Sequence, residues 1–299
     1  MSVLIVGSVA LDSIKTPMGK VQNVLGGSAT YASFAASLFT TPLLVAVVGD
    51  DFSEEHRQVF EKKGIDLAGF ATADGKTFQW QGRYGYDMNA AETLGVQLNV
   101  FQHFNPELPD GWSDAPYAFL GNIDPELQLR VRQQLTRPKL VACDSMNYWI
   151  AGKRRQLLKV LKAADLLLLN DGEARQLTGE HHIGKMARAL MRMGPTIVVV
   201  KKGEHGALLA FGQRFFSTPG YVVDEVYDPT GAGDSFAGGM IGYLASTHRI
   251  TWESLKLSVI YGSALASLTI EDFGTTQLAK TTRGVLEQRV AALSRLTRW

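Results

Sequence analysis

The stretch Asp228-Pro229-Thr230-Gly231-Ala232-Gly233-Asp234-Ser235-Phe236-Ala237-Gly238-Gly239 says more about fold and chemistry than any other part of the chain. It follows a strand-like run at 221–223 and opens a long apolar helix. Gly231 and Gly233 are small enough to bring the backbone close to a ligand. The free N–H groups and the dipole at a helix N-terminus both favour an anion. We therefore expect Gly231, Ala232 and Gly233 to form an anion hole.

Asp234 stands in the first turn of the same predicted helix, directly after the glycines. The helix N-terminus is expected to keep its carboxylate ionised, so that it accepts a proton from a hydroxyl group. Phosphoryl transfer to an alcohol needs such a base beside an anion hole, because amides neutralise the moving phosphoryl group while the carboxylate takes the proton. The alternative is that Asp234 only caps the helix and the glycines only form the turn.

Short apolar runs, several of them β-branched, alternate along the chain with amphipathic stretches. The runs cover residues 3–6, 43–48, 117–121, 139–143, 165–169, 196–200 and 207–211. Runs of this kind suit strands buried on both faces, and the stretches between them suit helices that cover the sheet. The pattern predicts an α/β fold, with a mainly parallel sheet between two helical layers in a single domain over residues 1–299.

Residues 77–86 break this pattern, because apolar and polar side chains alternate there with a period of two. One face carries Phe78, Trp80, Tyr84 and Tyr86, and the alternation returns after a turn at Val96, Leu98 and Val100. The segment predicts an antiparallel hairpin whose apolar face covers a ligand or packs on a second subunit. An ordinary edge hairpin of the main sheet is the alternative.

Composition and charge argue against several classes of function. The formal net charge of the 299 residues is +1, which gives no electrostatic footprint for nucleic acid or an anionic membrane. No apolar stretch approaches the roughly 18 residues that a membrane-spanning helix needs. The single cysteine, Cys143, has no partner for an internal disulfide. A reducing, cytoplasmic setting is expected.

The segment 228–239 resembles the C-terminal signature of the ribokinase-like (PfkB) carbohydrate kinases. Further similarities follow the family's order over nearly the whole chain, at Gly7–Asp12, Gly26-Gly27, Val47–Phe52, Asn170–Glu173 and Lys201–Gly206. The resemblance implies a three-layer α/β/α ribokinase-like fold with a small β lid near residues 12–25 and 75–103. It also implies ATP as the phosphate donor and Mg²⁺ as a cofactor.

The resemblance assigns roles to residues on both sides of the reaction. On the acceptor side it implies substrate contacts for Asp12, Gly26 and Gly27. On the nucleotide side it implies contacts for Asn170, Lys201, Gly203, Gly206, Thr230 and Gly262. For ions it implies Mg²⁺ binding, mostly through water, by Glu173 with Asn170, and a monovalent cation such as K⁺ beside Asp228. From the residues alone, Asn170 and Glu173 fit a helix capping box equally well, and Gly262 fits a helix-packing position.

Tyr31 is the main departure from the family's pattern, which usually has Asn at the fourth residue beyond the diglycine. A phenol cannot offer the paired donor and acceptor of an amide to vicinal hydroxyls. Its ring can instead stack on a base or on a sugar face. We expect Tyr31 to bind the substrate, and the departure leaves the identity of the acceptor open.

The residues and the resemblance together predict an ATP-dependent kinase that phosphorylates an alcohol group of a sugar. In-line transfer would use Asp234 as general base and the loop Gly231–Gly233 as anion hole. Two alternatives remain: a nucleoside kinase of the same family, and a non-catalytic ligand-binding sensor that has kept the fold. A homodimer through the lid is a further expectation, since many members of the family dimerise there.

Overall fold

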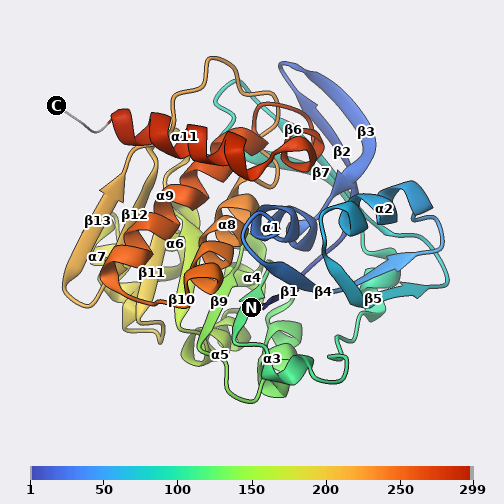
Figure 1. Cartoon of the computed structure of the whole chain (residues 1–299), viewed down its shortest axis with the longest axis horizontal. Helices are drawn as coiled ribbons and strands as arrows, with labels where there is room; N and C mark the ends of the chain where they lie inside the picture. Colours follow the sequence, from blue (N-terminus) through green and yellow to red (C-terminus); the bar gives the residue numbers. More distant parts are fainter. Residues whose placement is uncertain (1, 297–299) are drawn as a thin grey trace.

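A computed structural model describes residues 2–296 and contains one large and one small β-sheet (Figure 1). The large sheet has nine strands in the order β13-β12-β11-β10-β9-β8-β1-β4-β5. Their bounds are β1 (Ser2–Val6), β4 (Thr41–Gly49), β5 (Asp66–Ala73), β8 (Tyr117–Leu120), β9 (Leu140–Asp144), β10 (Leu166–Asn170), β11 (Ile197–Lys201), β12 (Ala207–Phe211) and β13 (Arg214–Thr218). Neighbouring strands are parallel except at β11–β12 and β12–β13. All seven apolar runs of the sequence lie in this sheet, as predicted.

Two layers of helices cover the sheet and make separate apolar cores with its two faces. Figure 1 shows part of the first layer in front of the sheet, and this layer contains α1 (Ser28–Ala36), α8 (Ala232–Thr247), α9 (Trp252–Thr269), α10 (Thr276–Lys280) and α11 (Arg283–Arg295). The second layer contains α3 (Pro125–Gln134), α4 (Asn147–Gly152), α5 (Arg154–Ala163), α6 (Asp171–Thr178) and α7 (Ile183–Met191). A further helix, α2 (Glu54–Lys62), contributes Phe60 to the first core, next to Phe70 of β5. Within residues 2–296 no helix is long and apolar enough to span a bilayer.

The small sheet is the predicted lid, and Figure 1 shows it at the upper right of the molecule. Its order is β3-β2-β6-β7, with β2 (Ala10–Thr16), β3 (Gly19–Gly26), β6 (Phe78–Tyr84) and β7 (Ala91–Gln97). The predicted hairpin is β6–β7, and it pairs with β2 and not with the large sheet. The alternative of an edge hairpin of the main sheet is therefore wrong.

The hairpin is shorter than its alternation suggested. Tyr86 lies beyond the end of β6 and is 94% exposed. Leu98 follows β7, and Val100 belongs to a 3₁₀ helix, η1 (Asn99–His103). The side-chain amide of Asn99 donates to the carbonyl of Thr77 (2.9 Å), which turns the chain back beside the start of β6. The alternation of apolar and polar residues in the sequence continues to Val100, but β7 ends at Gln97, before this hydrogen bond.

The lid touches the segment that precedes α8 at two places. The Thr16 hydroxyl donates to the carbonyl of Tyr227 (2.9 Å). The Thr230 hydroxyl donates to the Tyr84 hydroxyl (3.2 Å), directly before Gly231. The aromatic face of β6 is therefore turned toward the loop that the sequence marks as the anion hole.

Helices α1 and α8 lie so close together that their backbones are in contact. A Cβ atom at Gly238 would overlap the carbonyl oxygen of Ala32, and a Cβ at Gly242 would lie 2.9 Å from the Cα of Ala36. Small residues on both helices permit this approach, which larger side chains would prevent. The start of α1 and the start of α8 are thereby fixed relative to each other.

We expect Gly238→Ala to lower the free energy of unfolding by about 1–3 kcal/mol, because the new methyl group has no space against the α1 backbone. Gly184→Ala in α7 is the matched control, since nothing lies within 4 Å of its Cβ position. That change should be neutral or stabilising by up to about 1 kcal/mol, the ordinary helix preference of Ala over Gly. Urea unfolding of both variants measures the difference; equal stabilities would contradict the packing argument.

Candidate active site

Polar residues end three adjacent parallel strands of the large sheet. Asp144 ends β9, Asn170 ends β10 and Lys201 ends β11. The carboxyl ends of parallel strands meet at one edge, where ligands of open α/β sheets bind. The anion-hole segment 228–234 reaches the same edge, because Lys201 Nζ lies 2.9 Å from the position of a Cβ on Gly233.

The loop before α8 presents free backbone N–H groups, as an anion hole requires. Gly231 has φ +75°, a left-handed conformation that favours glycine, and it forms the N-cap of α8. The Ala232 amide donates to the Pro229 carbonyl (3.2 Å), which makes it part of the turn. The amides of Gly233 and Asp234 have no acceptor within the described chain. The amides of Gly233 and Asp234 are therefore the groups of this segment that are free to donate to an anion.

Asp234 lies in the first turn of α8, and none of residues 2–296 hydrogen-bonds its carboxylate. Burial and the negative charge of Asp144 raise the pKa of Asp234 to about 7, while Lys201 lowers it. The expectation that the helix N-terminus alone keeps this group ionised is therefore too simple. A carboxylate that titrates near neutrality and has no partner is suited to accept a proton.

Lys201 and Asp144 form an ion pair of 2.7 Å at this edge, with side chains 15% and 6% exposed. Burial lowers the pKa of Lys201, but the charges of Asp144 and Glu173 outweigh it, so the pKa is raised. The buried Gln128 amide donates to the backbone carbonyl of Asp144 (2.9 Å) and holds the end of β9. The sequence analysis missed Asp144, although a carboxylate directly after the apolar run 139–143 was a usable signal.

Asn170 and Glu173 form a capping box at the start of α6. The Asn170 side chain accepts from the Glu173 amide (2.7 Å), and Glu173 Oε2 accepts from the Asn170 amide (2.8 Å). Burial, followed by the charge of Asp144, raises the pKa of Glu173 to about 7. Among residues 2–296 no group of three or more His, Cys, Asp or Glu side chains could enclose a metal ion. These residues suit contacts to a hydrated cation better than direct coordination.

The acceptor-side residues converge where the lid joins α1. Gly26 pairs with Ala10 across β2 and β3, and a Cβ at Gly26 would overlap the Asp12 carboxylate. Gly27 has φ +93° and is the N-cap of α1. The diglycine thus leaves room for Asp12, which is 3% exposed and whose Oδ1 has no hydrogen-bond partner in the described chain. Burial and the charge of Asp228 raise the pKa of Asp12 to about 8.

Tyr31 lies between these two regions and is only 1% exposed. Its ring packs against Gly231, where a Cβ atom would overlap the ring. The expectation that this ring stacks on a base is wrong, because one face is covered and the side chain is buried. The hydroxyl has no hydrogen-bond partner within residues 2–296.

The remaining predicted residues fall into two groups. Gly203 and Gly206 have positive φ values of 54° and 82° in the turn after β11, at the same sheet edge. A Cβ at Gly262 would instead lie 2.8 Å from the Phe236 carbonyl, which favours its helix-packing alternative between α8 and α9.

Asp228 clamps the loop, because its oxygens accept from the amides of Thr230 (2.9 Å) and Gly274 (2.9 Å). Both carboxylate oxygens are thus used in backbone hydrogen bonds. The predicted monovalent cation beside Asp228 stays a prediction.

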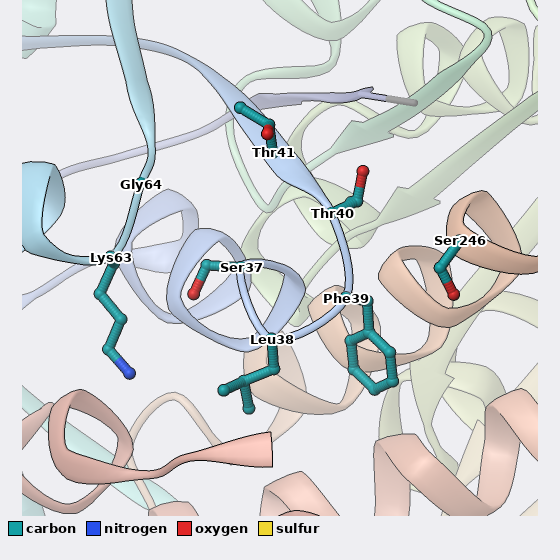
Figure 2. Close-up of a pocket in the computed structure, with 8 residues that line it drawn as sticks. All are labelled: Ser37, Leu38, Phe39, Thr40, Thr41, Lys63, Gly64 and Ser246. Atoms are coloured by element: carbon teal, nitrogen blue, oxygen red, sulfur yellow. The ribbon is translucent and has the colours of Figure 1, made fainter.

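A shallow hollow of about 510 Å³ lies at the far end of α1 and contains no comparable chemistry (Figure 2). Burial lowers the pKa of its Lys63 to about 8. The Lys63 ammonium already donates to the carbonyls of Leu278 (3.0 Å) and Thr281 (3.1 Å). The carboxyl edge of the sheet therefore remains the candidate active site.

Comparison with known proteins identifies the family of the chain. The family model for "pfkB family carbohydrate kinase" matches residues 126–282. A cytidine kinase of Thermococcus kodakarensis is 30% identical over 81% of this chain and 88% of its own length. A nucleoside kinase of Methanothermobacter thermautotrophicus is 28% identical over 87% of this chain and 82% of its own length.

Solved structures resemble the fold across the whole chain. The nucleoside kinase of Burkholderia thailandensis in complex with inosine superposes with a TM-score of 0.78 at 19% identity, over 97% of this chain and 98% of that one. At this identity the likeness establishes the ribokinase-like fold alone. The family model and the relative at 30% identity add the activity, and the alternative of a non-catalytic sensor is set aside. The chain belongs to the pfkB family of carbohydrate kinases and is a kinase.

Proposed function

We propose that this protein is a nucleoside kinase that transfers the γ-phosphate of ATP to a hydroxyl group of a ribonucleoside. The sequence analysis expected a sugar as the acceptor and gave a nucleoside as the alternative. The proposal adopts the nucleoside. Two relatives that match more than four fifths of the chain are a cytidine kinase and a nucleoside kinase. The observation that carries the proposal is the position of Trp80 on the lid.

Trp80 and Asp12 are register partners in the parallel strands β6 and β2, so their side chains share one face of the lid. The half-buried indole lies flat on Gly82, where a Cβ would overlap its ring. Its Nε1 donates to the Thr93 hydroxyl (3.3 Å). A fixed indole with one face on the backbone offers the other face for stacking. Sugar hydroxyls bound at Asp12 would leave a base roughly one strand spacing away, about 5 Å, next to this ring.

Asp234 and the first turn of α8 supply the proposed chemistry. The γ-phosphate would lie against the amides of Gly233 and Asp234 and beside the Lys201 ammonium, which neutralise its charge. An acceptor hydroxyl held near Asp12 would give its proton to the Asp234 carboxylate. At the same time the new O–P bond forms and the bond to the leaving ADP breaks. The lid contact between Tyr84 and Thr230 would help to exclude water from this step.

Mg²⁺ held beside Glu173 and Asn170 would supply positive charge that offsets the negative charge of the phosphates. Glu173 and Asn170 are the residues that fit a contact to the waters of Mg²⁺. The capping box holds both side chains in place at the start of α6. Asp228 is the residue that would lie beside K⁺.

Assembly through the lid is a separate proposal. Leu94 and Val96 of β7 are 54% and 50% exposed, which supports a homodimer formed there.

The first prediction concerns the base. Asp234→Asn should lower kcat by about 10²–10⁴-fold, the usual contribution of general base catalysis, while ATP still binds. In the unaltered enzyme kcat/KM should fall about tenfold or more per pH unit below about pH 7. The base must be ionised, and its pKa is raised to about 7. Asp66→Asn, on the exposed β5 edge, is the isosteric control and should match the unaltered enzyme. Near-normal turnover of Asp234→Asn would show that Asp234 is not the general base.

The second prediction concerns the acceptor. Trp80→Ala should weaken nucleoside binding by about 1–3 kcal/mol, the range of base–aromatic stacking, and Trp80→Phe should retain much of it. Calorimetric titration with cytidine and inosine measures this directly. Tyr86→Ala is the control, because that exposed ring lies outside the hairpin strands.

A turnover assay with a panel of nucleosides, ribose and fructose then decides between the acceptor classes. Phosphorylation of nucleosides with weak use of free sugars is expected. Turnover of a free pentose or hexose with no response to any nucleoside would overturn the proposed acceptor and restore the sugar alternative. Nucleoside binding that is equal in Trp80→Ala and Tyr86→Ala would show that the base lies elsewhere.

A further inference from the structure

A buried ion pair crosses the carboxyl edge of the large sheet and adjoins the anion loop. Lys201 ends β11 and Asp144 ends β9, and the two side chains meet across β10, with 2.7 Å between Nζ and Oδ2. Lys201 Nζ also lies 2.9 Å from the position of a Cβ on Gly233. The ammonium group therefore lies between the Asp144 carboxylate and the backbone of the anion loop.

The Asp144 carboxylate is itself held in one orientation. Its Oδ1 accepts from the amide of Ser145 (2.8 Å), which leaves Oδ2 for Lys201. The backbone carbonyl of Asp144 accepts from the buried Gln128 side chain (2.9 Å), whose Nε2 also donates to the carbonyl of Gly121 (2.8 Å). These bonds tie the ends of β8 and β9 together. A lysine side chain has many rotamers, so a carboxylate fixed in this way selects one position for the ammonium group.

Two other carboxylates compete for the Lys201 ammonium. The negative charges of Glu173 and Asp234 act on it, as that of Asp144 does. Within the described chain, however, only Asp144 forms an ion pair with Lys201. A pairing with Asp234 would stabilise the ionised form of that carboxylate and make it a weaker base. Buried ion pairs add little net stability, since desolvation offsets the attraction, so this contact is better explained by where it places the ammonium group.

We propose that Asp144 is a positioning residue for phosphoryl transfer, which holds the Lys201 ammonium beside Gly233 and away from Asp234. This inference rests on the proposed function, in which the γ-phosphate lies beside Lys201, and it adds a residue to that mechanism. Asp144 acts only through Lys201. It directs the positive charge at the phosphate and leaves the base free to take the proton of the acceptor.

A double-mutant cycle with Asp144→Asn and Lys201→Met tests this dependence. Asp144→Asn should lower kcat about ten- to a hundredfold, since a displaced ammonium group stabilises the transferred phosphoryl group less. Lys201→Met should lower kcat about 10²–10³-fold, as for a lost transition-state donor. The double variant should equal Lys201→Met within about twofold, because Asp144 then has nothing to position. A further fall in the double variant, by the same factor as in Asp144→Asn alone, would overturn the proposal.

The acceptor KM separates positioning from a loosened fold. It should be nearly unchanged in Asp144→Asn, because the proposed acceptor residues Asp12 and Trp80 belong to the lid. An acceptor KM that rises while kcat falls would indicate a structural effect and overturn the positioning role.

Asp124→Asn is the matched control for the loss of a lysine partner. Asp124 pairs with Lys153 (2.6 Å) at the start of α3, and Asn caps a helix as well as Asp does. The kcat of Asp124→Asn should match that of the unaltered enzyme. A loss equal to that of Asp144→Asn would count against a specific role of Asp144.

A crystal structure of Asp144→Asn reads the position of the ammonium group directly. Lys201 Nζ should leave Gly233 and approach Asp234 or Glu173, and an ammonium group that stays beside Gly233 would contradict the proposal. Asp144→Asn leaves a buried charge unpaired and can fail to fold for that reason. The double variant removes both charges, so its comparison with Lys201→Met alone still decides the question.

The result for Asp144 is separable from the rest of the proposed function. The cycle uses whichever acceptor the enzyme turns over, so a sugar would replace the proposed nucleoside and leave the comparison intact. Near-normal turnover of Asp234→Asn would reject the general base, while equal kcat values for Lys201→Met and the double variant would still support Asp144. A normal kcat for Lys201→Met would overturn the role of Asp144 together with the phosphate contact of Lys201.

Discussion

The contact between helices α1 and α8 fixes the geometry on which the site depends. Gly238 and Gly242 let the two backbones touch, so no flexible side chain separates the helices. The acceptor region lies at the start of α1, and the anion loop lies at the start of α8. Close-packed backbones transmit displacement with little slack. In the proposed site, the packing of α1 on α8 would set the distance between the acceptor and the phosphate.

Charge is the second constraint on the site. The charges of Asp144, Glu173 and Asp234 act on the buried Lys201 ammonium, while Asp228 and Asp234 act on Asp12. Burial raises the pKa of Asp12, Glu173 and Asp234 to between about 7 and about 8. Ionised carboxylates without partners are costly in such a place. The protein without ligand therefore retains protons near neutral pH. A bound cation would offset part of this negative charge, which agrees with a kinase that uses metal-bound ATP.

The sequence contains a hairpin with an apolar face, which an α/β fold must cover. In the structure this hairpin joins β2 and β3 in the lid. Strand β6 turns Phe78, Trp80 and Tyr84 to one side, and Tyr84 reaches the residue before the anion loop. Phe78 contacts Phe101 of η1 at a ring separation of 5.5 Å. Trp80 lies between these two fixed ends, beside Asp12. Exposed apolar residues of the lid include Leu94 and Val96 of β7, and Val96 is the register partner of Trp80, so it shares the face that we propose for the acceptor.

The sequence by itself determined seven of the nine strands of the large sheet, the loop and helix at 228–239 and the kinase family. The strand expected at 221–223 is absent, since β13 ends at Thr218 and an irregular segment leads to the loop. The features determined correctly depend on local periods and on short contiguous motifs, which a single chain displays directly. It did not determine the ion pair of Lys201 with Asp144, whose partners are 57 residues apart. It also misjudged Tyr31, because only the packing of α1 on α8 buries that ring under Gly231. Pairing and burial across such separations depend on which elements become neighbours, and only the tertiary structure decides that.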